Sequence, residues 1–233
     1  MTIMTNFKPL SIVKTFFVKK HRRARKIRSG IFKGLVMNID LTYQAQLFLG
    51  LFERETYKWV SKFAKGINAA IDVGAGEGEY TIYFLKKTSA KKVFSFEPNE
   101  SKRRLLTNNL GVSDIESGKI LLYSKMLSSS SSDNSITLDS IISRVLTPCL
   151  LKIDTDGTEV DILKGAGDFL KLGDIRFIIE THSKTLEEDC ISILNKAGFT
   201  TKVIPNAWWR LFIPEQRPSI HNRWLAANNT LYK

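Results

Sequence analysis

The 233-residue sequence has only two cysteines, Cys149 and Cys190, and no Cys-x-x-Cys or Cys/His cluster. It therefore offers neither a disulfide framework nor the ligand spacing of a structural zinc site. Such sparing use of cysteine is typical of a reducing compartment, so we expect a cytoplasmic protein. No run approaches the roughly 18 apolar residues that a membrane-spanning helix needs. With 43% hydrophobic and 25% charged residues, the composition is that of a globular protein.

Acidic residues are absent from the first 39 positions, which carry ten of the 35 lysines and arginines. These ten account for most of the formal net charge of +12. The excess positive charge therefore belongs to an N-terminal arm, and the rest of the chain is nearly neutral. A charge block of this kind is typical of a contact with an anionic partner or of a solvated surface.

The arm combines this charge with an apolar pattern. Apolar residues at helical spacing precede a basic run: Leu10, Val13, Phe16 and Phe17, then Lys19 to Lys26. The pattern predicts a basic amphipathic helix over residues 9–27. Such a helix could lie on an anionic membrane, follow nucleic-acid phosphates, or pack on the domain with its charges merely solvated. Residues 8–33 are therefore a candidate contact with nucleic acid or with a membrane, where the protein would be peripheral.

Residues 30–60 also show helical spacing, which predicts a helical cap after the arm. We therefore expect an arm and cap over residues 1–60 and a main domain over residues 61–233. In the main domain, short apolar runs alternate with amphipathic stretches. The predicted strands are 69–73, 92–96, 120–123, 149–154 and 176–180, and the predicted helices are 80–87, 100–110, 160–170 and 186–197. This alternation is typical of an α/β fold with a parallel sheet, which binds ligands at the carboxyl ends of its strands.

The first predicted strand runs into the glycine loop, IDVGAGEG at residues 71–78. The dinucleotide fingerprint GxGxxG fails here because Glu79 stands at the third glycine position, and no Gly-Lys-Ser/Thr follows to make a P-loop. Glu77 would also repel a pyrophosphate. Asp72 at the start of the loop suits a cationic ligand, such as S-adenosylmethionine with its ammonium and sulfonium groups. Glu97, which ends the second strand, is placed to accept hydrogen bonds from ribose hydroxyls.

Three stretches resemble the FkbM family of S-adenosylmethionine-dependent methyltransferases: IDVGAGEGEYT at 71–81, FEPN at 96–99, and LKIDTDGTE at 151–159 continuing through LKGA at 163–166. TLD at 137–139 and IETH at 179–182 also match family positions, so the likeness covers about residues 69–199, with a weaker echo in HNRW at 221–224. Gly76 stands where the family often has asparagine. Asp156 replaces the usual glutamate, which puts any role of the longer side chain in doubt.

The resemblance implies a Rossmann-like, seven-stranded class I methyltransferase sheet with helices on both faces. The last strands would form an antiparallel hairpin, for which 199–204 and 223–227 are the candidates. We expect the cofactor site to comprise Asp72, Gly74, Ala75, Gly76, Tyr80, Thr81, Glu97, Pro98, Asn99, Met126 and Asp154.

Three polar residues end the fourth and fifth predicted strands and are the candidate catalytic groups: Asp154, Glu180 and His182. Methyl transfer to a hydroxyl needs alignment and a group that takes the proton, and a carboxylate or histidine serves this purpose. Asp156 looks like a helix cap with Glu159 as its partner, although Glu159 could equally pair with a cation. Asp154, Asp156 and Glu180 could together hold a divalent ion, but their spacing does not establish one, so we expect no metal.

The methyl acceptor is less constrained than the cofactor. The Asp/Asn-Pro-Pro-Tyr/Phe signature of N-methylation is absent, and the resemblance favours a hydroxyl on a sugar or other small molecule. An RNA methyltransferase that grips phosphates with the arm is the main alternative within enzymes. A non-catalytic module that binds the cofactor and is recruited to a membrane by the arm is the other. Trp208, Trp209 and Trp224 could line an acceptor pocket, although core packing is the commoner role of such residues.

Overall fold

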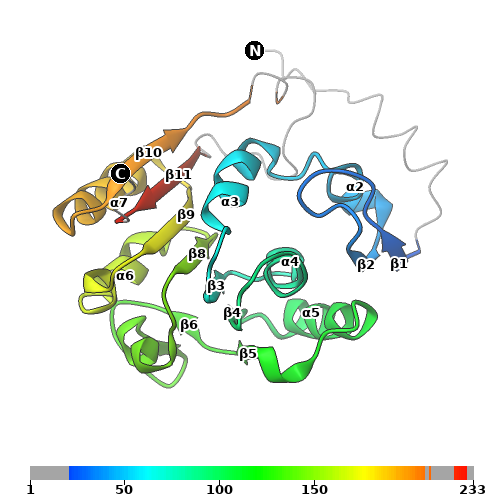
Figure 1. The fold of residues 1–233 in the computed structure, drawn as a ribbon, viewed down its shortest axis with the longest axis horizontal. Coiled ribbons are helices and arrows are strands. Elements are labelled where there is room, and N and C mark those ends of the chain that lie inside the picture. The colour runs from blue at the N-terminus through cyan, green and yellow to red at the C-terminus, as the bar shows by residue number, and fades with distance from the viewer. Residues whose placement is uncertain (1–20, 208–209, 211–222, 230–233) are drawn as a thin grey trace, which may run out of the picture.

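The computed structural model describes residues 21–207, 210 and 223–229, and these form an α/β fold around a seven-stranded sheet (Figure 1). In spatial order the strands are β10 (Thr200–Ile204), β11 (Arg223–Asn228), β9 (Ile175–Thr181), β8 (Cys149–Ile153), β3 (Ala69–Val73), β4 (Lys92–Phe96) and β5 (Ile120–Tyr123). β11 runs antiparallel to β10 and to β9, and every other pair of neighbouring strands in this sheet is parallel. The expected sheet and its closing antiparallel pair are both confirmed.

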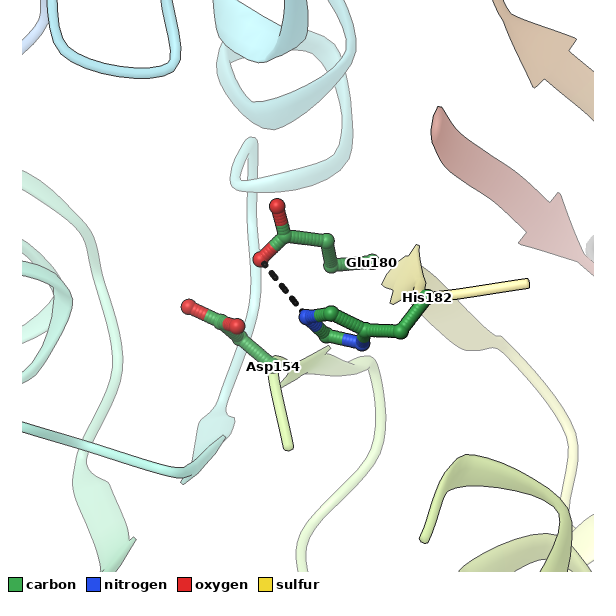
Figure 2. A group of neighbouring side chains, drawn as sticks. All are labelled: Asp154, Glu180 and His182. Carbon is green, nitrogen blue, oxygen red and sulfur yellow. Dashed lines mark ion pairs between the residues drawn. The ribbon is translucent and has the colours of Figure 1, made fainter. Parts of the chain in front are cut away.

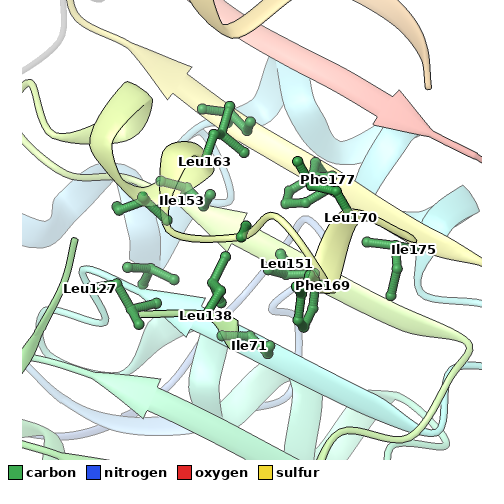
Figure 3. Packing of buried hydrophobic residues seen from close by; sticks show 14 of the residues in the cluster. Ile71, Leu127, Leu138, Leu151, Ile153, Leu163, Phe169, Leu170, Ile175 and Phe177 are labelled. Carbon is green, nitrogen blue, oxygen red and sulfur yellow. The ribbon is translucent and has the colours of Figure 1, made fainter. Parts of the chain in front are cut away.

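Helices cover both faces of the sheet, as predicted. One face carries α3 (Tyr57–Phe63), α4 (Glu79–Lys87) and α5 (Glu100–Val112), and the other carries α6 (Glu159–Lys164) and α7 (Lys184–Lys196). The central strands are apolar on both sides because each side is covered. Along β8, for example, Leu151 packs with the α6 and α7 side and Leu150 with the α4 side. Figure 3 shows the first of these two clusters, with Leu151 beside Ile71 and Phe177.

The described part of the basic arm is not helical, which corrects the helix predicted over residues 9–27. β1 (Arg23–Lys26) pairs antiparallel with β2 (Val36–Ile39), and we call this unit the basic hairpin. Its strands bury Ile27, Met37 and Ile39 in the same cluster as α4, and this burial outweighs the local helical spacing. The first half of the predicted helix, including Leu10, Val13, Phe16 and Phe17, lies outside the described residues.

The predicted cap forms only in part as helix. Residues 36–39 are strand, and the helices are α2 (Leu41–Leu49), the 3₁₀ turn η1 (Arg54–Thr56) and α3. Val60 and Phe63 of α3 join the apolar cluster that also contains Ala70 and Leu150 of the sheet. The hairpin and cap thus pack directly against the main sheet, and the division of the chain at residue 60 stays a prediction.

The helix predicted over residues 160–170 is split into α6 and the 3₁₀ turn η4 (Phe169–Lys171). Between them Gly165 lies so close to a neighbouring loop that a Cβ there would be 2.1 Å from the carbonyl oxygen of Ser128. Asp139 holds the start of η4, because its carboxylate accepts hydrogen bonds from the backbone N–H groups of Asp168 (3.0 Å) and Phe169 (2.7 Å). The Asp139 N–H also donates to the Gly165 carbonyl at 3.2 Å, so TLD and LKGA are in direct contact.

The remaining described elements are short. They are the strands β6 (Met126–Leu127) and β7 (Ser135–Ile136) and the 3₁₀ turns η2 (Ser117–Lys119) and η3 (Asp139–Arg144). The longest described helices, α5 and α7, have 13 residues each. In the described part of the chain, no helix has both the length and the apolar character needed to cross a bilayer.

One buried arginine ties the cap to the sheet. Arg176 of β9 is 3% exposed and pairs with Asp174, with Nε 2.8 Å from Oδ1. Its guanidinium also donates to the carbonyl oxygens of Phe63 (2.7 Å) and Lys65 (2.8 Å), at the end of α3. These contacts satisfy carbonyls that the end of a helix leaves without a partner.

We expect Arg176→Met to lower the free energy of unfolding by about 3–5 kcal/mol, because it leaves Asp174 and two carbonyl groups without their buried partner. Urea denaturation followed by circular dichroism measures this change. The control is Arg104→Met, which removes an arginine that is 76% exposed and paired with Glu100 on the surface of α5; its effect should stay within about 0.5 kcal/mol. Equal effects of the two variants would contradict a structural role for Arg176.

Candidate active site

A cavity of about 700 Å³ opens at the carboxyl ends of β3, β4, β8 and β9. Its floor is the glycine loop and the ends of these strands, and its other walls come from α2, the residues before η1, and Arg210. Every predicted cofactor or catalytic residue lines this cavity except Thr81. Thr81 is fully buried behind Asp72 and donates a hydrogen bond to Asp72 Oδ2 at 2.6 Å, so it supports the site from outside.

The glycine loop is shaped by a close crossing of two chain segments. Gly74 has φ +77°, and a Cβ on it would lie 1.9 Å from the carbonyl oxygen of Asp154. The two segments are also joined by a backbone hydrogen bond, in which the Asp154 N–H donates to the Val73 carbonyl at 3.0 Å. Only glycine fits at this position, because a side chain would force the ends of β3 and β8 apart.

Glu97 joins the glycine loop to the end of β4. Its carboxylate accepts hydrogen bonds from the N–H groups of Gly76 and Asn99, each at 2.8 Å, and the residue is 4% exposed. Asn99 in turn caps α5 by accepting from the Lys102 N–H at 3.1 Å. Since a carboxylate oxygen can accept more than one hydrogen bond, Glu97 keeps capacity for ligand hydroxyls while the backbone holds it in place.

Asp72 is 1% exposed at the end of β3, and burial raises the pKa of its carboxyl. Oδ2 is held by Thr81, whose hydroxyl also contacts Ser95 Oγ at 2.8 Å. Oδ1 has no hydrogen-bond partner among the described residues. Asp72 therefore offers the cavity one free acceptor atom on a rigidly held side chain.

Lys152 is a residue of this site that the sequence analysis did not assign. It is 4% exposed in the central strand β8, and its Nζ lies 2.9 Å from Asp154 Oδ2 and 4.6 Å above the centre of the Tyr80 ring. Burial alone lowers the pKa of Lys152, but the carboxylates of Asp154, Glu53 and Asp72 raise it overall. The signal in the sequence was a lysine inside the apolar strand run LLKI, where only a paired charge is tolerated.

The candidate catalytic residues come together at the ends of β8 and β9 (Figure 2). His182 Nε2 lies 3.9 Å from Glu180 Oε2, and one ligand atom each of Asp154, Glu180 and His182 lie within 4.8 Å of one another. Burial opposes ionisation of Asp154, yet Lys152 lowers the pKa of this carboxyl overall. Burial and the Asp154 charge raise the pKa of Glu180. Asp154 is therefore the more acidic carboxyl of the two, and Glu180 is the one that a proton favours.

Glu159 holds His182 from behind. This fully buried carboxylate lies 2.6 Å from His182 Nδ1, which leaves Nε2 facing Asp154, Glu180 (3.9 Å) and the exposed Asp156 (3.7 Å). The predicted capping role of Asp156 and Glu159 was wrong: the residue before α6 is Thr158, without a side-chain cap. Because the chain turns at Gly157 (φ +97°), Asp156 is carried to the surface, where its side chain is 73% exposed. The sequence analysis also considered that Glu159 pairs with a cation. When His182 is protonated, its contact with Glu159 is such a pair.

The same cluster bears on metal binding. The set considered from sequence, Asp154, Asp156 and Glu180, does not gather, and His182 takes the place of Asp156. Asp154, Glu180 and His182 have the atom types that a divalent ion accepts, and Glu159 orients the histidine as carboxylates do behind metal-bound histidines. The Lys152 ammonium, 2.9 Å from Asp154 Oδ2, already pairs with one of these three residues.

Of the three tryptophans, Trp224 lies under Lys152 as part of the core, 5.7 Å from Nζ to the ring centre and 0% exposed. It does not line the cavity. Trp208 and Trp209 lie outside the described residues.

The contact with Glu159 raises the pKa of His182. We therefore expect His182 to titrate above 6.5 in NMR spectra of the three histidines, and Glu159→Gln to lower its pKa. The pair stabilises the fold fully at low pH and loses this contribution as the pH rises through the raised pKa. The control is Asp156→Asn, which removes an exposed carboxylate 3.7 Å from Nε2 and should shift the titration less. A larger shift in the control would contradict the assignment of Glu159 as the main partner.

Comparison with known proteins adds a family and a fold. The model of the methyltransferase FkbM domain matches residues 122–201, and no curated protein matches the chain. The methyltransferase FkbM of Methylobacillus flagellatus is 19% identical with a TM-score of 0.55, covering 70% of this chain but only 44% of that one. TYW2 of M. jannaschii, solved in complex with AdoMet, is 14% identical with a TM-score of 0.52, covering 91% and 87%.

A third structure, the precorrin-6y C5,15-methyltransferase of Geobacter metallireducens, is 11% identical with a TM-score of 0.51, covering 75% of this chain and 87% of its own. At these identities the structures establish the fold, and the chain spans less than half the length of the Methylobacillus protein. The resemblance found in the sequence is confirmed by the domain match. The FkbM methyltransferase domain model matches residues 122–201, which lie within a seven-stranded sheet of the class I methyltransferase fold.

Proposed function

We propose that this protein transfers a methyl group from S-adenosylmethionine to a hydroxyl of a sugar or other small molecule. The FkbM domain match and the methyltransferase fold support the reaction type. The AdoMet complex of TYW2, which shares the fold, supports the cofactor. The hydroxyl acceptor rests on the family resemblance and on the absence of an N-methylation signature.

The charge of the cavity is the observation that carries the proposal. Among the described lining residues, carboxylates outnumber cations: Glu53, Asp72, Glu77, Glu79, Glu97, Asp154, Asp156 and Glu180 against Lys102, Lys152 and Arg210. Burial raises the pKa of Glu53 to about 8 and that of Glu79 to about 7, so the cavity lacks positive charge. A sulfonium and an ammonium would supply it, whereas a diphosphate would add further negative charge.

The lining residues accommodate each part of such a cofactor. Glu97 is placed for the ribose hydroxyls, because its two oxygens are fixed by the backbone and can still accept. Met126, which is 47% exposed, and Pro98 offer an apolar wall for the adenine. The glycine loop provides backbone groups and the free Oδ1 of Asp72 for the amino-acid end.

S-adenosylmethionine, when bound, supplies a methyl group activated by positively charged sulfur. We assign His182 Nε2 as the atom that takes the acceptor's hydroxyl proton, because Glu159 holds Nδ1 and so fixes the tautomer that leaves Nε2 free. Asp154, kept ionised by Lys152, stabilises the imidazolium that forms. Glu180, whose raised pKa favours its protonated form, can donate a hydrogen bond to orient the acceptor. The raised pKa of His182 favours proton uptake during the transfer.

Calorimetry with S-adenosylmethionine tests the cofactor assignment. We expect Asp72→Ala and Glu97→Ala each to weaken binding at least about tenfold, since each removes a hydrogen bond that involves a charged group. Asp154→Asn should instead lower turnover more than binding, once labelled methyl transfer to a panel of hydroxylated small molecules has identified the acceptor. Glu100→Gln, which alters an exposed carboxylate on α5, serves as the control. Unchanged affinity in both alanine variants, or tight binding of a nicotinamide dinucleotide, would overturn the proposal.

The second candidate function is methylation of RNA held by the basic hairpin. Arg23, Lys26 and Lys33 are exposed on this hairpin, and Arg22 forms an ion pair with Glu77 in the glycine loop. The positive surface thus begins at the mouth of the cavity. A non-catalytic module is the third reading, and cofactor binding without methyl transfer to any acceptor would favour it.

Charge removal on the hairpin separates these candidates. Deletion of residues 1–30 would remove Ile27 from the core, so we choose the triple variant Arg23→Gln, Lys26→Gln and Lys33→Gln. The small-molecule enzyme should keep its turnover, whereas an RNA enzyme should lose RNA affinity and about 2 units of salt slope. A matched control replaces Lys164, Lys171 and Lys184, three exposed lysines at α6, η4 and α7. Loss of binding to anionic lipid vesicles in the hairpin variant alone would instead assign this surface to a membrane.

A further inference from the structure

We propose that Glu53, from the cap and not from the methyltransferase sheet, binds the ammonium group of the cofactor's amino-acid end. This inference rests on the proposed function, and it adds a residue that neither the sequence motifs nor the FkbM domain match at 122–201 includes. Glu53 lies between α2 and η1 and lines the cavity.

The backbone at Glu53 is held in an unfavourable conformation. Its φ of +47° and ψ of +34° are left-handed, a region that residues other than glycine rarely adopt. The conformation is fixed by Thr56, whose N–H and hydroxyl both donate to the Glu53 carbonyl, at 3.0 Å and 2.8 Å. Strain of this kind persists where the surrounding structure enforces it, and it is concentrated at ligand-binding sites.

The side chain at this position is buried and incompletely satisfied. Glu53 is 7% exposed, and its Oε2 accepts no hydrogen bond from any described residue. A buried carboxylate oxygen without a donor is unfavourable, so an occupied site should provide one. The cavity that Glu53 lines is the space from which that donor can come.

The protein itself does not supply enough positive charge there. Lys152 is the main cation acting on Glu53, and its ammonium is already 2.9 Å from Asp154. Lys152 and Asp72 lie opposite each other on β8 and β3, so Asp72 shares the same cation. Three carboxylates therefore depend on one lysine, and Glu53 is the one that reaches the cavity from the cap side.

The missing partner must be a hydrogen-bond donor, which distinguishes the two charged groups of the cofactor. A sulfonium carries no hydrogen on sulfur and cannot satisfy Oε2, whereas an ammonium has three N–H donors. The free Oδ1 of Asp72 lies on the sheet side of the same cavity. The ammonium would therefore satisfy Oε2 of Glu53, and the free Oδ1 of Asp72 is a second acceptor in the same cavity.

Three ligands test this assignment by calorimetry on the full chain: S-adenosylmethionine, S-adenosylhomocysteine, which keeps the ammonium but lacks the sulfonium, and 5′-methylthioadenosine, which lacks both. We expect Glu53→Gln to weaken the first two about 10- to 100-fold and equally, and to leave the third unchanged. A larger loss for S-adenosylmethionine than for S-adenosylhomocysteine would place Glu53 at the sulfur and overturn the assignment. Equal losses for all three ligands would make Glu53 a purely structural residue.

A second variant separates binding from folding. Glu53→Gly removes the carboxylate and also suits the left-handed backbone, so the thermal midpoint of the ligand-free protein should stay unchanged or rise while affinity for S-adenosylhomocysteine falls as in Glu53→Gln. A lower midpoint with unchanged affinity would contradict the proposal. Failure of the wild-type protein to bind any of the three ligands would refute the proposed function itself, which distinguishes that outcome from a failure at Glu53 alone.

Discussion

The ion pair between Lys152 and Asp154 is the interaction on which the site depends. It places a positive charge in the middle of a buried parallel sheet, where an unpaired charge would be very costly. Because Lys152 neutralises only part of the surrounding carboxylate charge, it keeps Asp154 ionised while Glu53, Asp72 and Glu180 keep raised pKa values. The cavity thus has an excess of carboxyl groups, and a cationic ligand would balance their negative charge.

The sequence predicted the sheet and much of the site because both depend on local signals. Strands buried on both faces read as short apolar runs, and the glycine loop and the carboxylates follow them directly along the chain. Gly74 could be assigned because the close crossing of two segments demands glycine. Glu97 could be assigned because a fixed acceptor of hydrogen bonds demands a carboxylate. Lys152 was overlooked because its partners other than Asp154, among them Glu53, Asp72 and Tyr80, come from distant parts of the chain.

The errors have the same physical origin. The basic run 19–26 carries no period of its own, and the strand formed by residues 23–26 depends on pairing with residues 36–39 and on the burial of Met37 and Ile39. Asp156 fits a capping pattern locally, but the chain turns at Gly157, the cap position falls on Thr158, and Glu159 contacts His182 instead. Glu53 has no motif at all, and only its burial in the cavity identifies it.

Proton release on binding tests the central claim most directly. If the cavity holds carboxyl groups that are partly protonated for want of a cation, S-adenosylmethionine must lower their pKa values and expel protons at pH 7, where Glu53 and Glu79 have pKa values of about 8 and 7. Calorimetry in buffers of different ionisation enthalpy measures this number. The account predicts net release of protons from the protein. Binding without buffer dependence, or with proton uptake, would contradict it.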